Sequence, residues 1–222
     1  MKNLLLIIII SFSFQGFSQE IKTYKIGDFA QGGIIFWLDE SGQHGLVCAK
    51  EDYPELLMWD TKFRTVDEGF KAKTPDKPLL SVFGDGPYSG EMNTAIIIAA
   101  LGFGDGRIYA AAACNELQVT ENEITYGDWY LPSRQELSIM YKNRKLIDKI
   151  ALENGGSTFK MDGDYRVIGN SYWSSTEDWE RKDKTRTPSH TAWQHNFKKG
   201  GQSFQIPAQK YMTFSVRAIR AF

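Results

Sequence analysis

The sequence predicts an α+β domain in which twisted antiparallel sheets pack against two or three helices. A β-branched and aromatic run at residues 34–38 is followed by turn residues and a second apolar run. Ser133 and Glu136 have the spacing of a capping box, a signal that opens a helix. Strand patterns return after residue 170. Strands that lie before and after a block of helices are typical of the α+β class.

The N-terminal residues 1–18 have the features of a secretory signal peptide. Lys2 is followed by an apolar run at residues 4–14, and Gly16 and Ser18 are the small residues that a signal peptidase reads. An uncleaved anchor is disfavoured because the apolar run is short for a membrane span. We expect cleavage after Ser18, a single domain over residues 19–222, and no stable membrane insertion afterwards. The mature protein is expected to be exported, whether periplasmic, on the cell surface or secreted.

The overall composition argues against nucleic acid as a partner. The chain has 26 basic and 27 acidic residues and a net charge of −1, so no global field attracts a polyanion. Aromatic residues make up 14% of the chain. This content suits a β-rich core and equally suits a surface that stacks on sugars, and composition does not separate the two.

The first third of the chain predicts a β-hairpin followed by a long irregular segment. Residues 34–38 and 44–50 form the two strands, and residues 39–42 form the turn. Residues 51–90 contain four prolines and no clear periodicity. A segment this long inside a domain is either functional or held by packing, and Trp59 is its expected anchor.

The middle of the chain predicts three helical segments. Asn93 and Thr94 are expected to cap a helix that ends at the glycines of 102–106, and a second helix is expected over 107–117. Residues 121–126 are expected to form a polar connection. The third helix begins at Ser133 and extends to about residue 150.

The last third predicts β-structure around a charged loop. We expect a strand at 171–175, a loop at 176–190, and a hairpin of 192–197 with 203–206 around a turn at 199–202. A last strand is expected over 211–222. Four tryptophans have strand-like surroundings and are expected in the core: Trp37, Trp129, Trp173 and Trp193.

Cys48 and Cys114 leave two alternatives open. Export permits a disulfide between them, which would close a long loop. Both residues also share strand or helix faces with apolar neighbours, a pattern that favours two small buried side chains.

Five segments together resemble the bacterial DUF1566 domains. They are residues 32–37 with 44–47, residues 128–133 with 136–137, residues 172–176, residues 192–193 with Phe197, and residues 216–220. That family is similar to the C-terminal domain of the Legionella collagen-like adhesin and, more distantly, to the C-type-lectin-like fold. The resemblance implies a C-type-lectin-like fold with paired terminal strands, and adhesion or glycan binding at the cell surface. The triplets Glu-Pro-Asn, Gln-Pro-Asp and Trp-Asn-Asp of calcium-dependent lectins are absent from the sequence, so calcium-mediated binding is not implied.

Residues typical of metal, cofactor or catalytic chemistry do not form a recognisable motif. His190 and His195 are five residues apart and would face opposite sides of a strand. An EF-hand at Asp162 would need its bidentate Glu where Trp173 stands. Neither a phosphate-binding loop nor a nucleophile elbow occurs. We therefore predict no metal, no cofactor and no catalytic residues. Arg217 and Arg220 bind either an anionic ligand or a carboxylate such as Asp128 or Glu136.

The candidate ligand-binding residues are Trp179, Arg181, Lys184 and Arg186 in the charged loop. An aromatic ring with interleaved cations can stack on a sugar and bind its acidic groups. The alternative is a solvated loop whose Trp179 folds back onto the domain.

The expected function is therefore a non-enzymatic binding module for a glycan or an extracellular or surface protein. One alternative is an exported enzyme with a scattered site, marked by a polar cleft with two carboxyls of perturbed pKa. Another is a structural part of a surface assembly, marked by an exposed apolar patch or an unpaired strand edge.

Overall fold

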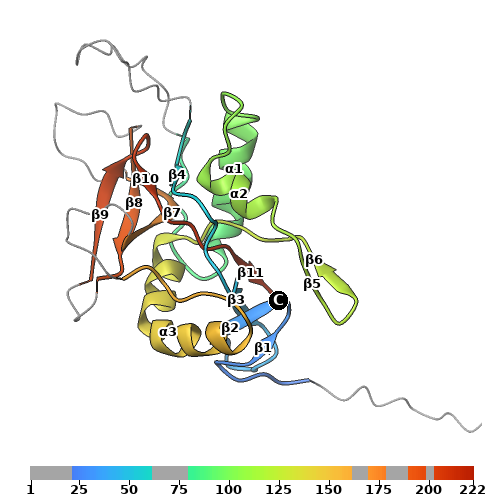
Figure 1. Ribbon diagram of the computed structural model, residues 1–222. Helices are drawn as coiled ribbons and strands as arrows, with labels where there is room; N and C mark the ends of the chain where they lie inside the picture. Colours follow the sequence, from blue (N-terminus) through green and yellow to red (C-terminus); the bar gives the residue numbers. More distant parts are fainter. Residues whose placement is uncertain (1–21, 62–79, 162–169, 179–189, 199–202) are drawn as a thin grey trace, which may run out of the picture.

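Antiparallel sheets and three helices make up the part of the chain that the structure describes (Figure 1). This structure is a computed structural model, and it describes residues 22–61, 80–161, 170–178, 190–198 and 203–222. The predicted signal peptide lies outside these ranges. The described sheets have four, two, two and three strands. The predicted α+β class is confirmed.

The four-stranded sheet has the order β1-β2-β3-β11, with β1 at Phe29–Ala30, β2 at Gly33–Leu38, β3 at Gly45–Cys48 and β11 at Ile219–Ala221. Strands β2 and β3 form the predicted hairpin, with a bulge between Ile35 and Trp37. Strand β11 pairs with β3, whereas β1 lies at the opposite edge of the sheet. The expectation that the terminal strands pair with each other is therefore wrong: the β2–β3 hairpin separates them.

Each face of this sheet packs against its own hydrophobic core, because side chains alternate along a strand. Ile35 and Val47 face a core that also contains helices α1, Ser89–Leu101, and α2, Ala110–Asn115. Ile34 and Phe36 face the other core, which helix α3, Arg134–Glu153, covers. The sheet thus lies between α3 and the α1–α2 pair.

Helix α3 begins with the predicted capping box. The Glu136 N–H donates to Ser133 Oγ at 3.2 Å, and the Ser133 N–H donates to Glu136 Oε2 at 2.6 Å. Leu137 and Met140 follow on the buried face. The helix continues to Glu153, slightly beyond the predicted end.

Helix α1 begins at Ser89, so the predicted capping role of Asn93 and Thr94 is wrong. Both residues are buried inside the helix and serve other segments. Asn93 Nδ2 donates to the Gly84 carbonyl at 2.8 Å, and Thr94 Oγ1 accepts the Leu131 N–H at 3.0 Å. Polar side chains that resemble caps in the sequence are here tertiary contacts. Helix α2 is shorter than predicted because Tyr109 is still extended.

Residues 119–126 form a hairpin where a polar connection was predicted. Strands β5, Val119–Glu121, and β6, Ile124–Tyr126, pair around Asn122 and Glu123, whose φ angles are 49° and 68°. Two consecutive left-handed residues match the right-handed twist of a two-stranded ribbon. Figure 1 shows this hairpin projecting from the body of the protein.

The three-stranded sheet has the order β7-β8-β9, with β7 at Ser171–Glu177, β8 at Thr191–Asn196 and β9 at Phe204–Gln209. The strands confirm the predicted ones, but the charged loop was predicted to begin too early. Thr176 and Glu177 belong to β7, and both are buried together with Asp178. The predicted turn at 199–202 lies outside the described residues.

Residues 211–222 form two short strands, so the single predicted last strand is wrong. Strand β10, Thr213–Phe214, pairs with β4, Leu57–Met58, and the chain then crosses to β11 in the central sheet. Between them Ser215 accepts the Trp173 N–H and donates its own N–H to the Ser171 carbonyl. This last stretch therefore links β4, β7 and β3.

Candidate functional site

The four predicted ligand-binding residues lie outside the described residues, as does segment 179–189 around them. The residues that flank this segment, Asp178 and His190, are described, and so are Thr61 and Leu80 on either side of segment 62–79. The geometry of the candidate site is therefore that of its base.

A buried ion pair forms the centre of this base. Lys210 Nζ donates to Glu177 Oε1, and the two side chains are 2% and 0% exposed. The ammonium also lies 4.2 Å from the centroid of the Trp59 ring, a cation–π contact. Glu177 accepts two further backbone N–H groups, from Leu80 and Val82, each at 3.3 Å. Its charge is thus balanced by one cation and two dipoles.

Backbone hydrogen bonds connect the same pair to the flanks of both segments. The Lys210 carbonyl accepts the N–H groups of Trp59 and Asp60 at 3.0 and 3.2 Å, and the Lys210 N–H donates to the His190 carbonyl at 2.9 Å. Asp178 and Thr191 are joined by their own backbone bond of 3.2 Å. All four flanks of segments 62–79 and 179–189 consequently meet around Glu177 and Lys210. We call these two residues, with Trp59, the basal cluster.

Sequence reasoning missed the basal cluster. Glu177 stood in a predicted solvated loop, and Lys210 stood between two predicted strands. Only tertiary contacts bury them, and no local pattern signals that burial. Trp59, in contrast, was predicted as an anchor, and it is fully buried.

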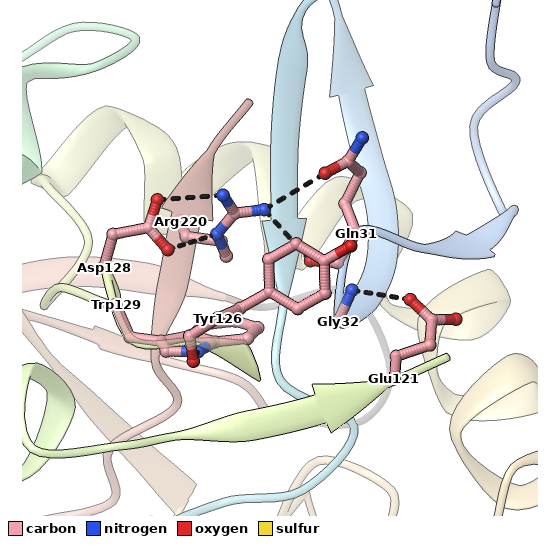
Figure 2. A network of polar contacts seen from close by, with 7 residues as sticks. All are labelled: Gln31, Gly32, Glu121, Tyr126, Asp128, Trp129 and Arg220. Atoms are coloured by element: carbon pink, nitrogen blue, oxygen red, sulfur yellow. Dashed lines mark hydrogen bonds and ion pairs between the residues drawn. The ribbon is translucent and has the colours of Figure 1, made fainter. Parts of the chain in front are cut away.

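Arg217 and Arg220 both pair with carboxylates, as one of the two alternatives predicted. Arg217 Nε donates to Asp52 Oδ1 at 2.6 Å, and both side chains are buried. Arg220 binds Asp128 through two bonds of 2.5 and 2.8 Å, its guanidinium lying 4.6 Å from the Tyr126 ring centroid (Figure 2). Asp128 was a predicted partner, whereas Asp52 was not. Neither arginine presents a free guanidinium to an anionic ligand.

Two described carboxyls have a raised pKa, and they lie apart. Burial raises the pKa of Glu136 to about 7, although the N–H of Ser133 stabilises its ionised form. Burial also raises the pKa of Asp148, despite the N–H of Phe159 that it accepts. The two residues are twelve positions apart on α3, a rise of about 18 Å along the helix axis. They do not form a catalytic pair.

The four tryptophans predicted to lie in the core divide into two groups. Trp129 and Trp173 are buried, and their indole N–H groups donate to the carbonyls of Tyr126 and Leu57. Trp37 and Trp193 are only partly buried, which corrects the prediction for them. The Trp193 ring is covered by the Arg134 guanidinium at 3.8 Å.

His195 is a buried aromatic side chain in this fold. Its ring lies 4.9 Å from that of Tyr141 and 5.0 Å from that of Phe197, and burial lowers its pKa to about 4. It is therefore neutral at pH 7. Among the described residues, no group of three or more His, Cys, Asp or Glu side chains is placed to hold a metal ion.

The two cysteines are buried free thiols in different cores. Cys48 lies in the core under α3, whereas Cys114 lies in the core of α1 and α2. Burial raises the pKa of Cys48 to about 12 and that of Cys114 still further above its usual range. Of the two alternatives left by the sequence, the structure has the unbridged one.

Two pockets open on the described surface. One, of about 310 Å³, lies between α2 and the end of β3; we call it the α2 pocket. The other, of about 280 Å³, lies beside Arg107, whose guanidinium is paired with Asp105. Neither pocket contains Glu136 or Asp148.

The comparisons with known proteins add no relative. No protein-family model matches the chain, and no curated protein matches it. Within the described ranges, none of the helices has the length and apolar content needed to cross a membrane.

Proposed function

We propose that this protein is an exported, non-enzymatic binding module with a C-type-lectin-like arrangement of its α+β domain. It would recognise a glycan or a surface protein through segments 62–79 and 179–189. The observation that carries the proposal is the convergence of all four flanks of these segments on the basal cluster. Binding residues are often placed on long connections that a rigid scaffold holds in position. The resemblance to DUF1566 domains supports the same conclusion.

The charges of the two segments favour an acidic ligand. Segment 62–79 contains five Lys or Arg and three Asp or Glu, and segment 179–189 contains four and two. Both are net positive in a chain whose net charge is −1. With Trp179 as a stacking ring and Arg181, Lys184 and Arg186 as donors, a glycan with carboxylate or sulfate groups is the preferred ligand.

A catalytic role has less support in the described part of the chain. A scattered active site would be expected to bring two carboxyls of perturbed pKa into one polar cleft. The carboxyls with raised pKa, Glu136 and Asp148, are instead separated along α3 and absent from both pockets. This separation supports binding over catalysis.

A glycan array probed with the mature chain 19–222 tests the site. We expect binding to acidic glycans that the double variant Trp179→Ala/Arg181→Ala loses. The variant Phe103→Ala/Lys149→Ala removes one exposed aromatic and one exposed cation elsewhere, so it is the matched control and should bind as wild type. Equal binding by all three proteins would overturn the assignment of the site.

The salt dependence separates electrostatic from stacking contacts. Lys184→Ala/Arg186→Ala should weaken binding strongly at low ionic strength and little near 1 M salt, where the Debye length is about 3 Å. An effect that does not depend on salt would contradict an acidic ligand.

Export is tested by sequencing the N-terminus of the protein recovered outside the cytoplasm. Cleavage after Ser18 predicts that this protein begins at Gln19. A retained 1–18 segment would contradict the proposed signal peptide.

A second candidate function, a structural part of a surface assembly, is favoured by the outer face of α1. This helix has a single charged residue, Glu91, and Met92 and the following Phe103 are 69% and 99% exposed. A helix that is apolar on all sides is normally covered. Strand β9 is an edge strand, but Pro207 within it lacks the N–H that strand addition needs.

Sedimentation velocity at increasing protein concentration tests this second function. Assembly through α1 predicts a self-association that Phe103→Glu abolishes, whereas Leu152→Glu, an equally exposed apolar position on α3, leaves it intact. A monomer at all concentrations would count against self-assembly.

A further inference from the structure

The α2 pocket is a hollow created by small residues. Its wall includes Ala113 from α2, Ala49 after β3 and Ala218 before β11. All three are buried, so larger side chains at these positions would fill the space. Protein interiors rarely contain voids larger than a water molecule. An opening of about 310 Å³ is at the lower end of the range of small-molecule sites.

The pocket carries one charged side chain without an internal partner. Three charged residues line it: Lys50, Glu51 and Asp52. Lys50 Nζ donates to the Asn154 carbonyl at 3.1 Å, and Asp52 is used by Arg217 and by the Tyr172 hydroxyl at 2.7 Å. Glu51 is exposed and forms no ion pair or side-chain hydrogen bond with any described residue. A carboxylate at the mouth of an apolar hollow favours a cationic ligand.

The walls of the pocket are fixed by hydrogen bonds from several elements. The Ala49 N–H donates to the Ala218 carbonyl at 2.9 Å, and the Tyr53 N–H donates to the Val216 carbonyl at 2.8 Å. On the side of the β5–β6 hairpin, Glu121 accepts the N–H of Gly32, which lines the pocket, at 2.8 Å (Figure 2).

The ion pair of Arg220 and Asp128 secures the same hairpin. The Arg220 guanidinium lies against the Tyr126 ring at the end of β6 and donates to the Gln31 carbonyl at 3.0 Å (Figure 2). Because the hairpin and the first turn are held together in this way, the pocket is formed before a ligand arrives. Such preorganisation lowers the cost of binding.

We propose that the α2 pocket binds a small organic cation, a protonated primary amine on an apolar body the size of one aromatic ring. The apolar body contacts Ala113, Ala218 and Leu117, and the ammonium pairs with Glu51. An anionic ligand fits less well, because the single lysine of the lining is already engaged. This site is separate from segments 62–79 and 179–189 and does not depend on their proposed function.

Three probes of similar shape test the proposal: benzylamine, benzyl alcohol and benzoate. Methyl NMR spectra of the mature chain 19–222 report directly on Ala49, Ala113, Ala218 and Leu117. We expect benzylamine to shift these methyl resonances in a saturable manner, benzyl alcohol to shift them at higher concentration, and benzoate to leave them unchanged. Methyl resonances that none of the probes moves, or that benzoate moves most, would overturn the proposal.

Two variants identify the residues that carry the binding. Ala113→Leu should abolish the shifts of both neutral and cationic probes, while Ala99→Leu on the exposed side of α1 is its matched control. Glu51→Gln is at an exposed position and should weaken benzylamine about fivefold, the upper range for an exposed ion pair, without affecting benzyl alcohol. Equal affinity of benzylamine for wild type and Glu51→Gln would contradict the assigned role of Glu51, even if Ala113→Leu folds poorly.

Discussion

Arg217 and Arg220 show how burial decides what one kind of ion pair contributes. Both arginines pair with an aspartate, but the Asp52 side chain is 5% exposed and that of Asp128 is 56% exposed. Removing a buried partner leaves a charge without compensation, whereas water replaces an exposed one. The two pairs therefore form a natural comparison within one molecule.

Asp52→Ala is expected to lower the free energy of unfolding by about 3–5 kcal/mol, because it leaves Arg217 buried and unpaired. Asp128→Ala is expected to lower it by about 1 kcal/mol or less. Urea denaturation of both variants checks the difference. Equal losses would show that burial does not control these pairs.

The buried thiols of Cys48 and Cys114 are expected to be unreactive in the folded protein. Burial raises both pKa values, so little thiolate forms near neutral pH. Thiol titration should detect almost no reaction natively and two thiols per chain in denaturant. A protein without free thiols in denaturant would instead contain the disulfide that the sequence left open.

At the scale of single elements, the start of α3 combines a strong local signal with an unusual cost. The capping box satisfies the first backbone N–H groups, but Glu136 is fully buried. Gly90 of α1 lies so close that a Cβ there would come within 2.4 Å of Glu136 Oε2. Close packing of α1 on this carboxyl is what removes it from water.

Glu136 is expected to make the free energy of unfolding fall as pH rises. The pKa is raised from 4.5 to about 7 in the folded protein, so folding favours the protonated form, and its contribution is lost between these two values. Glu136→Gln should therefore gain stability relative to wild type over this range, by up to about 3 kcal/mol. Urea denaturation at a series of pH values measures it, with the exposed Glu91→Gln as the control that should show no such trend.

Elements with local signals were predictable, and those that depend on tertiary contacts were not. The β2–β3 hairpin and the α3 capping box follow from turn residues and from side chains three positions apart. The start of α1 was misplaced because Asn93 and Thr94 bond to Gly84 and Leu131, which are distant in sequence. The break between β10 and β11 depends on two different sheets competing for one stretch.

The candidate site was less predictable than the fold. Trp179 and its cationic neighbours stand out in the sequence as a prediction that the described residues do not test. Glu177 and Lys210 at their base carry no sequence signal, because a charged residue in a strand is usually solvated. Their burial follows from the packing of Leu80, Val82 and Trp59 around them.

At the scale of the whole molecule, the Glu177–Lys210 pair connects parts of the chain that are otherwise separate. It joins β7, the residues after β9, the strand at Leu80–Val82 and the region of β4. Because several segments share it, its loss affects their packing together. It is the point at which the two proposed binding segments depend on the core.

Single changes in this pair are expected to be costly, and the double change less than additive. Lys210→Met and Glu177→Leu each leave a buried charge unpaired and should cost about 3–5 kcal/mol. Their combination removes both charges, so a double-mutant cycle should give a coupling of at least about 1 kcal/mol. Additive losses would indicate that the two side chains act independently.

The pairing of β11 with β3 also has a kinetic consequence. Ile219 lies opposite Cys48, so the central sheet closes only when residues about 170 positions apart in the chain meet. Domains dominated by such distant contacts have a high contact order and refold in milliseconds to seconds, whereas the β8–β9 hairpin can form locally and earlier. The last contact to form is commonly the first to open. Ile219→Val should accordingly speed unfolding more than it slows refolding in stopped-flow experiments.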